Sequence, residues 1–138
     1  MKGFFSLLVL TILSLSAFGQ QGTTNYKADA MHLMFFNVGS DKPISEPVLM
    51  GRSLKITYNS LNESLVVEYT DAKEGTRNKL FLDFLRYDED TENGLIMKDR
   101  HGNMFTVYIY DEDSSINIVS HKLVNNKYVA VQTILNII

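Results

Sequence analysis

The sequence predicts an all-β fold of about eight antiparallel strands. From Arg52 onward, apolar and polar residues alternate with a period of two, which places them on opposite faces of strands. Short segments rich in Gly, Asn, Asp and Ser separate these runs at hairpin-sized intervals. An up-and-down barrel is favoured because it needs only such short links and because closure removes exposed strand edges. A two-sheet sandwich fits the same strand count.

The clearest hairpin consists of Leu95–Lys98 and Met104–Tyr110, two runs rich in apolar, β-branched and aromatic residues. Between them, Asp99 can start a turn and Gly102 can adopt a positive φ. In the second run, the alternation separates two faces of a strand. One face carries Phe105, Val107 and Ile109, and the other carries Met104, Thr106, Tyr108 and Tyr110.

The first residues have the features of a secretory signal peptide. Lys2 supplies a positive charge, Phe4–Leu15 is mostly apolar, and Ala17–Gly19 places small residues before the cleavage point. The apolar run is about a dozen residues long, shorter than the roughly 20 that span a bilayer. We therefore predict a signal peptide over residues 1–19 and a single β-rich domain over residues 20–138 of a secreted or periplasmic protein.

The sequence contains no cysteine. Small secreted domains often depend on disulfides, so this domain must depend on packed aliphatic and aromatic side chains. It is long enough to do so, because domains of roughly 55–65 residues already fold alone. Without a thiol, we also expect no acyl anchor at the start of the mature chain.

The segment before the alternating region is less regular. Gln20–Asn25 is polar and predicts a frayed lead-in. Ala28–Phe36 fits both a helix and a strand, and its shortness favours a strand. Gly39–Gly51 contains both prolines of the chain, Pro43 and Pro47, which predicts a long loop or an irregular edge segment.

A second hairpin is predicted over Arg52–Thr70, with its turn at Ser60–Glu63. Each of its strands has one apolar face and one mostly polar face, as expected for a sheet with one solvated side. The apolar faces carry Leu54, Ile56 and Tyr58 in the first strand and Leu65, Val67 and Tyr69 in the second.

Three more strands follow the same rules. Lys79–Tyr87 is read as a strand for its aromatic content, although its leucines also suit a helix. Ile116–His121 and Tyr128–Ile137 are predicted as strands joined by a tight turn. In the first of the three, alternation places Leu80, Leu82 and Phe84 on one face and Phe81, Asp83, Leu85 and Tyr87 on the other.

The charge balance argues against some classes of partner. The formal net charge is −3, and it becomes −4 when Lys2 leaves with the signal peptide. Nucleic-acid binding needs clustered Lys and Arg, and this chain has no such cluster. An outer-membrane barrel is disfavoured because Lys55, Glu68 and Asp83 interrupt the apolar stripes of the strands. We expect no nucleic-acid partner and no transmembrane span in the mature chain.

An acidic turn between two predicted strands is a candidate calcium site. Ca²⁺ prefers about six to eight oxygen ligands. Asp88, Asp90 and Glu92 place carboxylates at alternate positions, and Asp99 is a distant fourth. The pattern departs from an EF-hand loop, because Asn93 stands where glycine is required and the flanks predict strands. The alternative is a solvated acidic turn.

Other catalytic and metal-binding patterns are weak or absent. His32, His101 and His121 match no zinc-ligand spacing. The chain has no G-x-S-x-G element, P-loop or dinucleotide fingerprint. Asp83 lies on an otherwise apolar strand, and a carboxyl facing a core would have a raised pKa and could act as an acid or a base. The alternative is that Asp83 points to solvent or pairs with a nearby basic residue.

The aromatic residues suggest a binding surface. Phe and Tyr concentrate on the predicted strands, and tyrosines give a strand face an apolar body with polar tips. In a barrel such a face could line a ligand cavity, and in a sandwich it could bind a protein. The alternative is core packing with scattered surface tyrosines. The candidate ligand-binding residues are Tyr58, Tyr69, Tyr108 and Tyr110.

The sequence therefore favours an exported, non-enzymatic binding domain for a small apolar ligand or an envelope protein. One alternative is a structural or inhibitory envelope protein that acts through loops such as Gly39–Gly51. Another is a hydrolase whose site residues follow no known motif. The strand number is similar to that of lipocalin-like barrels, but their early Gly-x-Trp element is absent because the chain contains no Trp. This similarity concerns the fold and implies no function.

Overall fold

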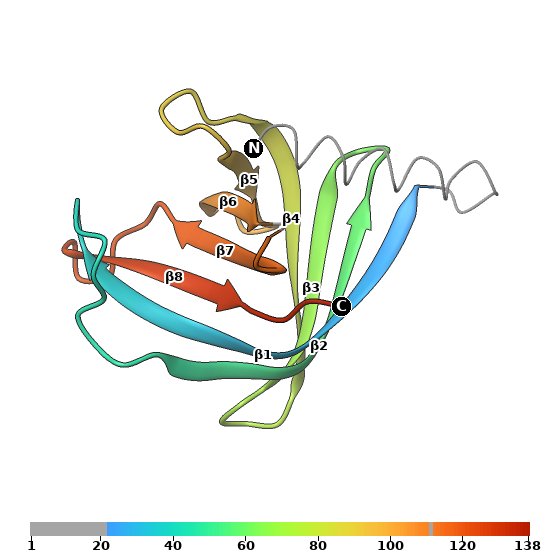
Figure 1. Ribbon diagram of the computed structural model, residues 1–138, viewed down its shortest axis with the longest axis horizontal. Coiled ribbons are helices and arrows are strands. Elements are labelled where there is room, and N and C mark those ends of the chain that lie inside the picture. The colour runs from blue at the N-terminus through green and yellow to red at the C-terminus, as the bar shows by residue number, and fades with distance from the viewer. Residues whose placement is uncertain (1–21, 111) are drawn as a thin grey trace.

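Eight antiparallel strands follow one another around a closed barrel, and the last strand pairs with the first (Figure 1). This computed structural model describes residues 22–110 and 112–138, so the predicted signal peptide lies outside the described residues. The up-and-down barrel is confirmed, and the sandwich alternative is excluded because one sheet closes on itself. The strands are β1 (Thr23–Asn37), β2 (Val48–Asn59), β3 (Ser64–Asp71), β4 (Arg77–Tyr87), β5 (Leu95–Lys98), β6 (Met104–Tyr110), β7 (Ser115–Ser120) and β8 (Tyr128–Ile134).

In that described part of the chain, no helix is long and apolar enough to cross a membrane.

β1 is longer than the sequence predicts. Gln20–Asn25 predicts a frayed lead-in, but from Thr23 onward this segment belongs to β1 and pairs with the end of β2. A polar segment is stable as a strand here because its neighbour completes its backbone hydrogen bonds. Thr57 Oγ1 also donates to Asn25 Oδ1 at 2.9 Å. The helix alternative for Ala28–Phe36 is excluded, since all of it is strand.

The proline-containing loop is shorter than the sequence predicts. β2 begins at Val48, inside the predicted loop Gly39–Gly51, so the connection is confined to residues 38–47. Within it, Pro43 lies opposite Phe36 in an isolated bridge. The loop is therefore attached to β1, although its prolines cannot join a regular ladder.

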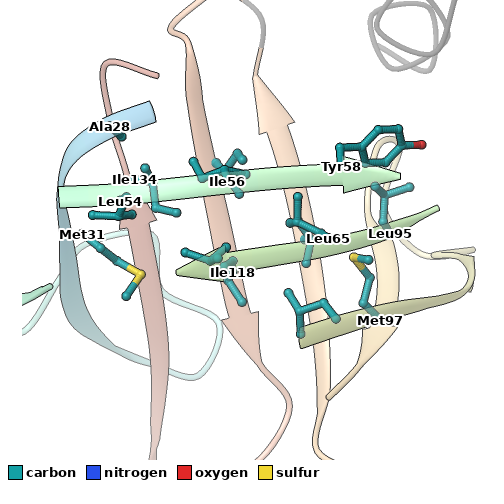
Figure 2. Packing of buried hydrophobic residues seen from close by; sticks show 14 residues of the cluster. Ala28, Met31, Leu54, Ile56, Tyr58, Leu65, Leu95, Met97, Ile118 and Ile134 are labelled. Carbon is teal, nitrogen blue, oxygen red and sulfur yellow. The ribbon is translucent and has the colours of Figure 1, made fainter. Parts of the chain in front are cut away.

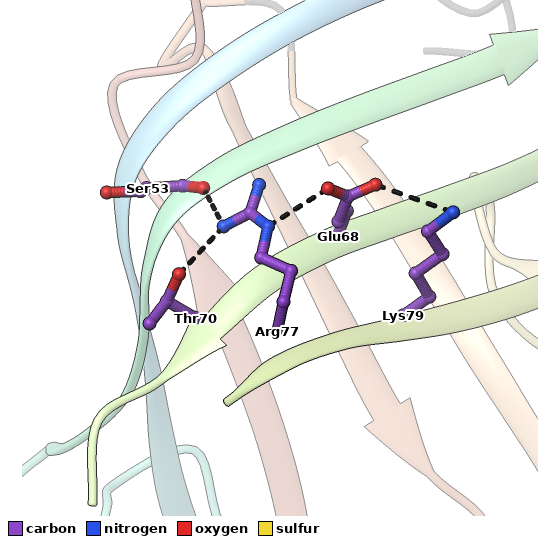
Figure 3. A network of polar contacts seen from close by, with 5 residues as sticks. All are labelled: Ser53, Glu68, Thr70, Arg77 and Lys79. Atoms are coloured by element: carbon purple, nitrogen blue, oxygen red, sulfur yellow. Dashed lines mark hydrogen bonds and ion pairs between the residues drawn. The ribbon is translucent and has the colours of Figure 1, made fainter. Parts of the chain in front are cut away.

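A polar network on the outer face fixes a bulge in β2 (Figure 3). The pairing of β2 with β3 shifts around Ser53, whose φ of 52° lies in the left-handed region. Arg77 Nη1 donates to the Ser53 carbonyl oxygen at 2.6 Å and to Thr70 Oγ1 at 3.0 Å. Arg77 Nε donates to Glu68 Oε2 at 2.9 Å, and this bond holds the pKa of Glu68 below its ordinary value. Lys79 Nζ lies 3.7 Å from Glu68 Oε1.

Side chains from every strand fill the barrel interior (Figure 2). The inner faces predicted by alternation for β2, β3 and β6, and for β4 as far as Phe84, are confirmed, because residues such as Val67, Leu82 and Val107 are fully buried. In β8 the core residue is Ile134, on the face opposite Val131 and Thr133. The residues of the core cluster are Ala28, Met31, Leu54, Ile56, Tyr58, Leu65, Val67, Leu82, Leu95, Met97, Val107, Ile116, Ile118 and Ile134.

The prediction that Tyr87, at the end of β4, lies on the same face as Phe81, Asp83 and Leu85 is wrong. The pairing of β4 with β5 shifts just after Phe84, which indicates a β-bulge at Leu85. The extra residue moves Tyr87 opposite the buried Leu95. Its ring meets the ring of Phe84 edge-on, with centroids 5.1 Å apart. Counting with a period of two cannot detect a bulge, because the shift exists only in the pairing.

The β5–β6 hairpin has the predicted turn. Asp99 Oδ1 accepts hydrogen bonds from His101 N at 2.9 Å and Asn103 N at 2.8 Å, and its Oδ2 accepts one from Asn103 Nδ2 at 2.9 Å. Gly102 has the expected positive φ, at 86°. Burial raises the pKa of Asp99, but the hydrogen bonds to its carboxylate lower it more, so the pKa lies below its ordinary value.

Truncation of a core leucine should be far more costly than truncation of an outer leucine on the same strand. We expect Leu82→Ala to lower the free energy of unfolding by about 2–5 kcal/mol, because Leu82 is fully buried and its loss leaves a cavity. Leu85→Ala is the matched control, since Leu85 is 44% exposed. It should change the free energy by less than about 0.5 kcal/mol in urea unfolding. Equal losses would contradict the assignment of the inner face.

Asp99 should stabilise the protein in a pH-dependent way. Because its pKa is lowered in the folded state, its contribution is present above its ordinary pKa of 3.8 and is lost as the pH falls below that value. We expect Asp99→Ala to lower the free energy of unfolding by about 1–2 kcal/mol at neutral pH and by less at pH 3. Asp83→Ala, on the exposed face of β4, is the control. A loss that is the same at both pH values would contradict this role.

A candidate ligand pocket at one end of the barrel

One end of the barrel carries a pocket of about 200 Å³. In an up-and-down barrel, odd-numbered strands begin and even-numbered strands end at the same end. The pocket follows this rule, since its walls come from the beginnings of β1, β3 and β7 and the ends of β2 and β6. The residues after β8 complete it. The lining residues are Tyr26, Ile56, Tyr58, Leu65, Ile109, Tyr110, Ser114, Ser115, Ile116, Ile137 and Ile138.

The barrel core forms the floor of the pocket. Ile56, Tyr58 and Leu65 line the pocket and also belong to the core cluster. Figure 2 shows Tyr58 at the end of β2, beyond Ile56, with its hydroxyl at the tip of the ring farthest from the strand. Because these residues pack within the core cluster, the floor of the pocket is rigid.

The lining combines aliphatic surface with neutral hydroxyl groups. Six of the lining residues are Ile or Leu, and five are Tyr or Ser. None of these lining residues carries a charged side chain or an imidazole. The interactions available to a ligand from these side chains are therefore apolar contact and hydrogen bonding to hydroxyls.

The environment keeps the tyrosine hydroxyls protonated. Burial raises the pKa of Tyr26. It also raises the pKa of Tyr58, where the nearby charge of Glu63 adds to the effect. For Tyr110, burial and the neighbouring Tyr108 raise the pKa, and a hydrogen bond with Asn117 partly opposes them. These hydroxyls therefore stay neutral donors well into the alkaline range.

The barrel wall has a gap beside the pocket. β8 ends at Ile134, opposite Met31 of β1. In the described structure, β8 therefore does not pair with the first part of β1, Thr23–Ala30. The residues after β8, Leu135–Ile138, cross this gap and are here named the C-terminal strap. Figure 1 shows them continuing from β8 toward β1.

Three backbone hydrogen bonds attach the C-terminal strap. Asn136 has a φ of 55°, in the left-handed region, where the chain leaves the direction of β8. Lys27 N donates to Ile138 O at 2.8 Å, and Ile138 N donates to Lys27 O at 2.9 Å. On the other side, Ile137 N donates to Ser114 O at 2.9 Å. The strap thus bridges β1 and the turn before β7, and it forms one side of the pocket.

Two of the four predicted ligand-binding tyrosines reach the pocket. Tyr58 and Tyr110 line it. Tyr108 stacks on Tyr110 with ring centroids 6.2 Å apart, and its hydroxyl donates to Thr91 Oγ1 at 3.2 Å, so it belongs to the outer face. Tyr69 is not among the lining residues and instead packs against the core.

Tyr69 has a structural partner in Gly51. A Cβ atom on Gly51 would lie 2.6 Å from Cδ2 of the Tyr69 ring. Only glycine lets the ring lie this close to the backbone of β2, and Tyr69 packs against the core near the end of β3, away from the pocket.

Tyr26, Ser114 and Ile137 are pocket residues that sequence reasoning missed. A signal existed only for Tyr26, which continues the period of two backward from Ala28. Ser114 and Ile137 lie outside the strands, and no local pattern brings them together.

The acidic turn before β5 is organised by its own hydrogen bonds. Asp88 Oδ1 accepts from Asp90 N at 3.0 Å, and Asp88 Oδ2 accepts from Thr91 Oγ1 at 2.8 Å. These bonds hold the pKa of Asp88 below its ordinary value. Among the described residues, no group of three or more His, Asp or Glu side chains is arranged to hold a metal ion. Calcium binding by Asp88, Asp90 and Glu92 stays a prediction.

The other singled-out polar residues lie on the outer surface or in turns. His121 Nε2 lies 2.7 Å from Thr106 Oγ1, and His101 is exposed in the β5–β6 turn. Asp83 is exposed on the outer face of β4, opposite Lys98, in accord with the solvent alternative.

No protein family, no characterised protein and no solved structure matches this chain. The chemistry of the pocket is therefore inferred from its own residues.

The calcium prediction can be tested by thermal unfolding. If Asp88, Asp90 and Glu92 bind Ca²⁺, millimolar calcium should raise the Tm, because a ligand that binds only the folded state stabilises it. Asp90→Ala and Glu92→Ala should remove that increase without changing the Tm in the absence of calcium. Magnesium at the same concentration controls for ionic strength. An unchanged Tm in calcium would contradict the prediction.

Proposed function

We propose that this protein is an exported binding protein that holds a small, uncharged, mainly apolar ligand at one end of its barrel. The observation that carries the proposal is the pocket of about 200 Å³, with aliphatic walls and neutral hydroxyl groups. Export is inferred from the predicted signal peptide over residues 1–19.

The volume limits the size of the ligand. An engineered cavity of roughly 150 Å³ accepts benzene, whereas sites for drug-sized molecules occupy about 300–1,000 Å³. A pocket of about 200 Å³ therefore suits a molecule somewhat larger than benzene. A long-chain fatty acid or a haem would not fit without rearrangement of the walls.

The lining limits the chemistry of the ligand. A charged ligand would lose hydration on entry and would find no opposite charge among the lining side chains. Aliphatic side chains favour an apolar body, and the Tyr and Ser residues of the lining bring hydroxyl groups that can hydrogen-bond to one polar group. The Tyr110 hydroxyl is already hydrogen-bonded to Asn117, so Tyr26 is the better candidate among the tyrosines. The ligand class is thus a small phenol, alcohol or ketone.

The proposal can be tested with p-cresol, which has an apolar ring, a hydroxyl group and no charge at neutral pH. At about 0.5 kcal/mol for each of its non-hydrogen atoms, its Kd should be on the order of 1 mM. With isoleucine methyl groups labelled for NMR, p-cresol should shift signals at the pocket and leave the others in place. The pocket isoleucines are Ile56, Ile109, Ile116, Ile137 and Ile138, and the internal controls are Ile44, Ile96, Ile118 and Ile134.

A matched pair of variants tests the location. Ile109→Trp should fill the pocket and abolish the shifts, because Ile109 lines it. Lys55→Trp introduces the same side chain on the exposed outer face of β2 and should leave binding unchanged. Shifts spread evenly over all isoleucines, or equal binding by both variants, would contradict the proposal.

A further inference from the structure

We propose that the C-terminal strap is the gate of the pocket and that its release from β1 and from Ser114 widens the opening through which the ligand enters. This inference rests on the proposed ligand-binding function. Apart from Ser114 in the turn before β7, the other walls of the pocket are strands of the closed sheet, whereas the strap is a short segment that lies across a gap between β1 and β7.

The strap is the wall that costs least to open. Two strand segments at the pocket lack a neighbour on one side: β1 between Thr23 and Ala30, and the end of β6 from Tyr108 to Tyr110, which does not pair with β5. The end of β6 is still held by a regular ladder with β7, whereas the strap belongs to no strand. Three backbone hydrogen bonds hold the strap. The first and last residues of the strap are exposed to solvent, Leu135 by 48% and Ile138 by 85%. Segments with few buried contacts and solvent-exposed hydrogen bonds open locally without unfolding the rest of a domain.

The floor and the strands have no comparable freedom. Ile56 and Ile134 are buried and held from several sides. Moving either residue would break a sheet ladder and expose apolar core at the same time. Ligand entry through the strap avoids both costs.

Three residues define how the strap is held and how it could move. Ile134, the last residue of β8, is fully buried and anchors the base. Asn136 bends the chain in a left-handed conformation, which Asn tolerates better than most residues. Ile137 holds the strap against the barrel, because its side chain packs against the core and also lines the pocket. Release of Ile137 uncovers the side of the pocket while β8 stays paired.

A reversible disulfide can lock the gate. Lys27 and Ile138 exchange both backbone hydrogen bonds, so their Cα atoms lie about 5.5 Å apart, within the range of disulfides. Lys27 is exposed, and Ile138, although it lines the pocket, is 85% exposed, so a bridge between them would lie at the solvent-exposed edge of the pocket. Because the chain has no cysteine of its own, Lys27→Cys with Ile138→Cys forms a single defined bond.

The experiment compares p-cresol binding to this double variant before and after reduction. In the reduced form, p-cresol should shift the four pocket isoleucines that remain in this variant, Ile56, Ile109, Ile116 and Ile137. Because Ile138 itself lines the pocket, the oxidised form is compared with the reduced form of the same variant and not with the wild type. In the oxidised form, the shifts should vanish or build up at least about tenfold more slowly, because the strap can no longer leave β1. Asn25→Cys with Thr57→Cys is the control, since it links β1 to β2 on the outer face and leaves the strap free.

The outcomes separate the two proposals. Equal and rapid binding in both redox states would overturn the gate and leave the binding function intact. No shift in either state would overturn the binding function, and the gate with it. Binding that the control disulfide blocks equally would also overturn the gate, because the effect would then come from general stiffening of β1.

Hydrogen exchange supplies a readout that needs no ligand and no substitution. The amides of Lys27, Ile137 and Ile138 should exchange at least about tenfold faster than the amide of Val67, at the centre of β3, because the strap opens locally. Exchange of the strap amides only at the rate of global unfolding would overturn the gate.

Discussion

Closure of the sheet by pairing between β1 and β8 is the constraint on which the rest of this structure depends. β1 has 15 residues and β8 has 7, so β8 can cover only the second half of its partner. A barrel whose closing strands differ this much in length must have an incomplete wall at one end. The C-terminal strap crosses that gap, and the pocket lies beneath it. The site is thus a direct consequence of how the barrel closes.

Away from the pocket end, side chains fill the barrel interior. Every strand contributes to one apolar cluster, and Tyr69 lies over Gly51 so closely that no other residue fits at that position. Bulges in β2 and β4 give the sheet the curvature that closure requires. Arg77 stabilises the bulge in β2 by donating to the carbonyl of Ser53. Polar contacts on the outer surface therefore stabilise the curvature of the sheet that surrounds the pocket.

The alternation of apolar and polar residues was sufficient to predict where the strands from Arg52 onward lie, the inner faces of β2, β3 and β6, and the Asp99 turn. The last strand, predicted over Tyr128–Ile137, was too long and ends at Ile134. Alternation failed where the deciding interaction was not local. Thr23 is in a strand because β2 lies beside it, and Tyr87 lies opposite Leu95 because a bulge shifts the register of β4. For the candidate site, Tyr58 was found because it belongs to the predicted apolar face of β2. Tyr110 was named from the opposite face of β6, and it lines the pocket because it is the last residue of that strand. Ile137 was not found, because its position depends on hydrogen bonds to distant segments.

The sequence by itself determined that the chain forms an antiparallel sheet with one apolar face, because strand period and turn chemistry depend on residues close together in the chain. Only the tertiary structure decided that the sheet closes as a barrel, that its closing strands are unequal and that the last residues cover the resulting gap. The physical reason is that register and strand length at the seam depend on pairing between the two ends of the chain, and no local pattern of residues encodes that pairing.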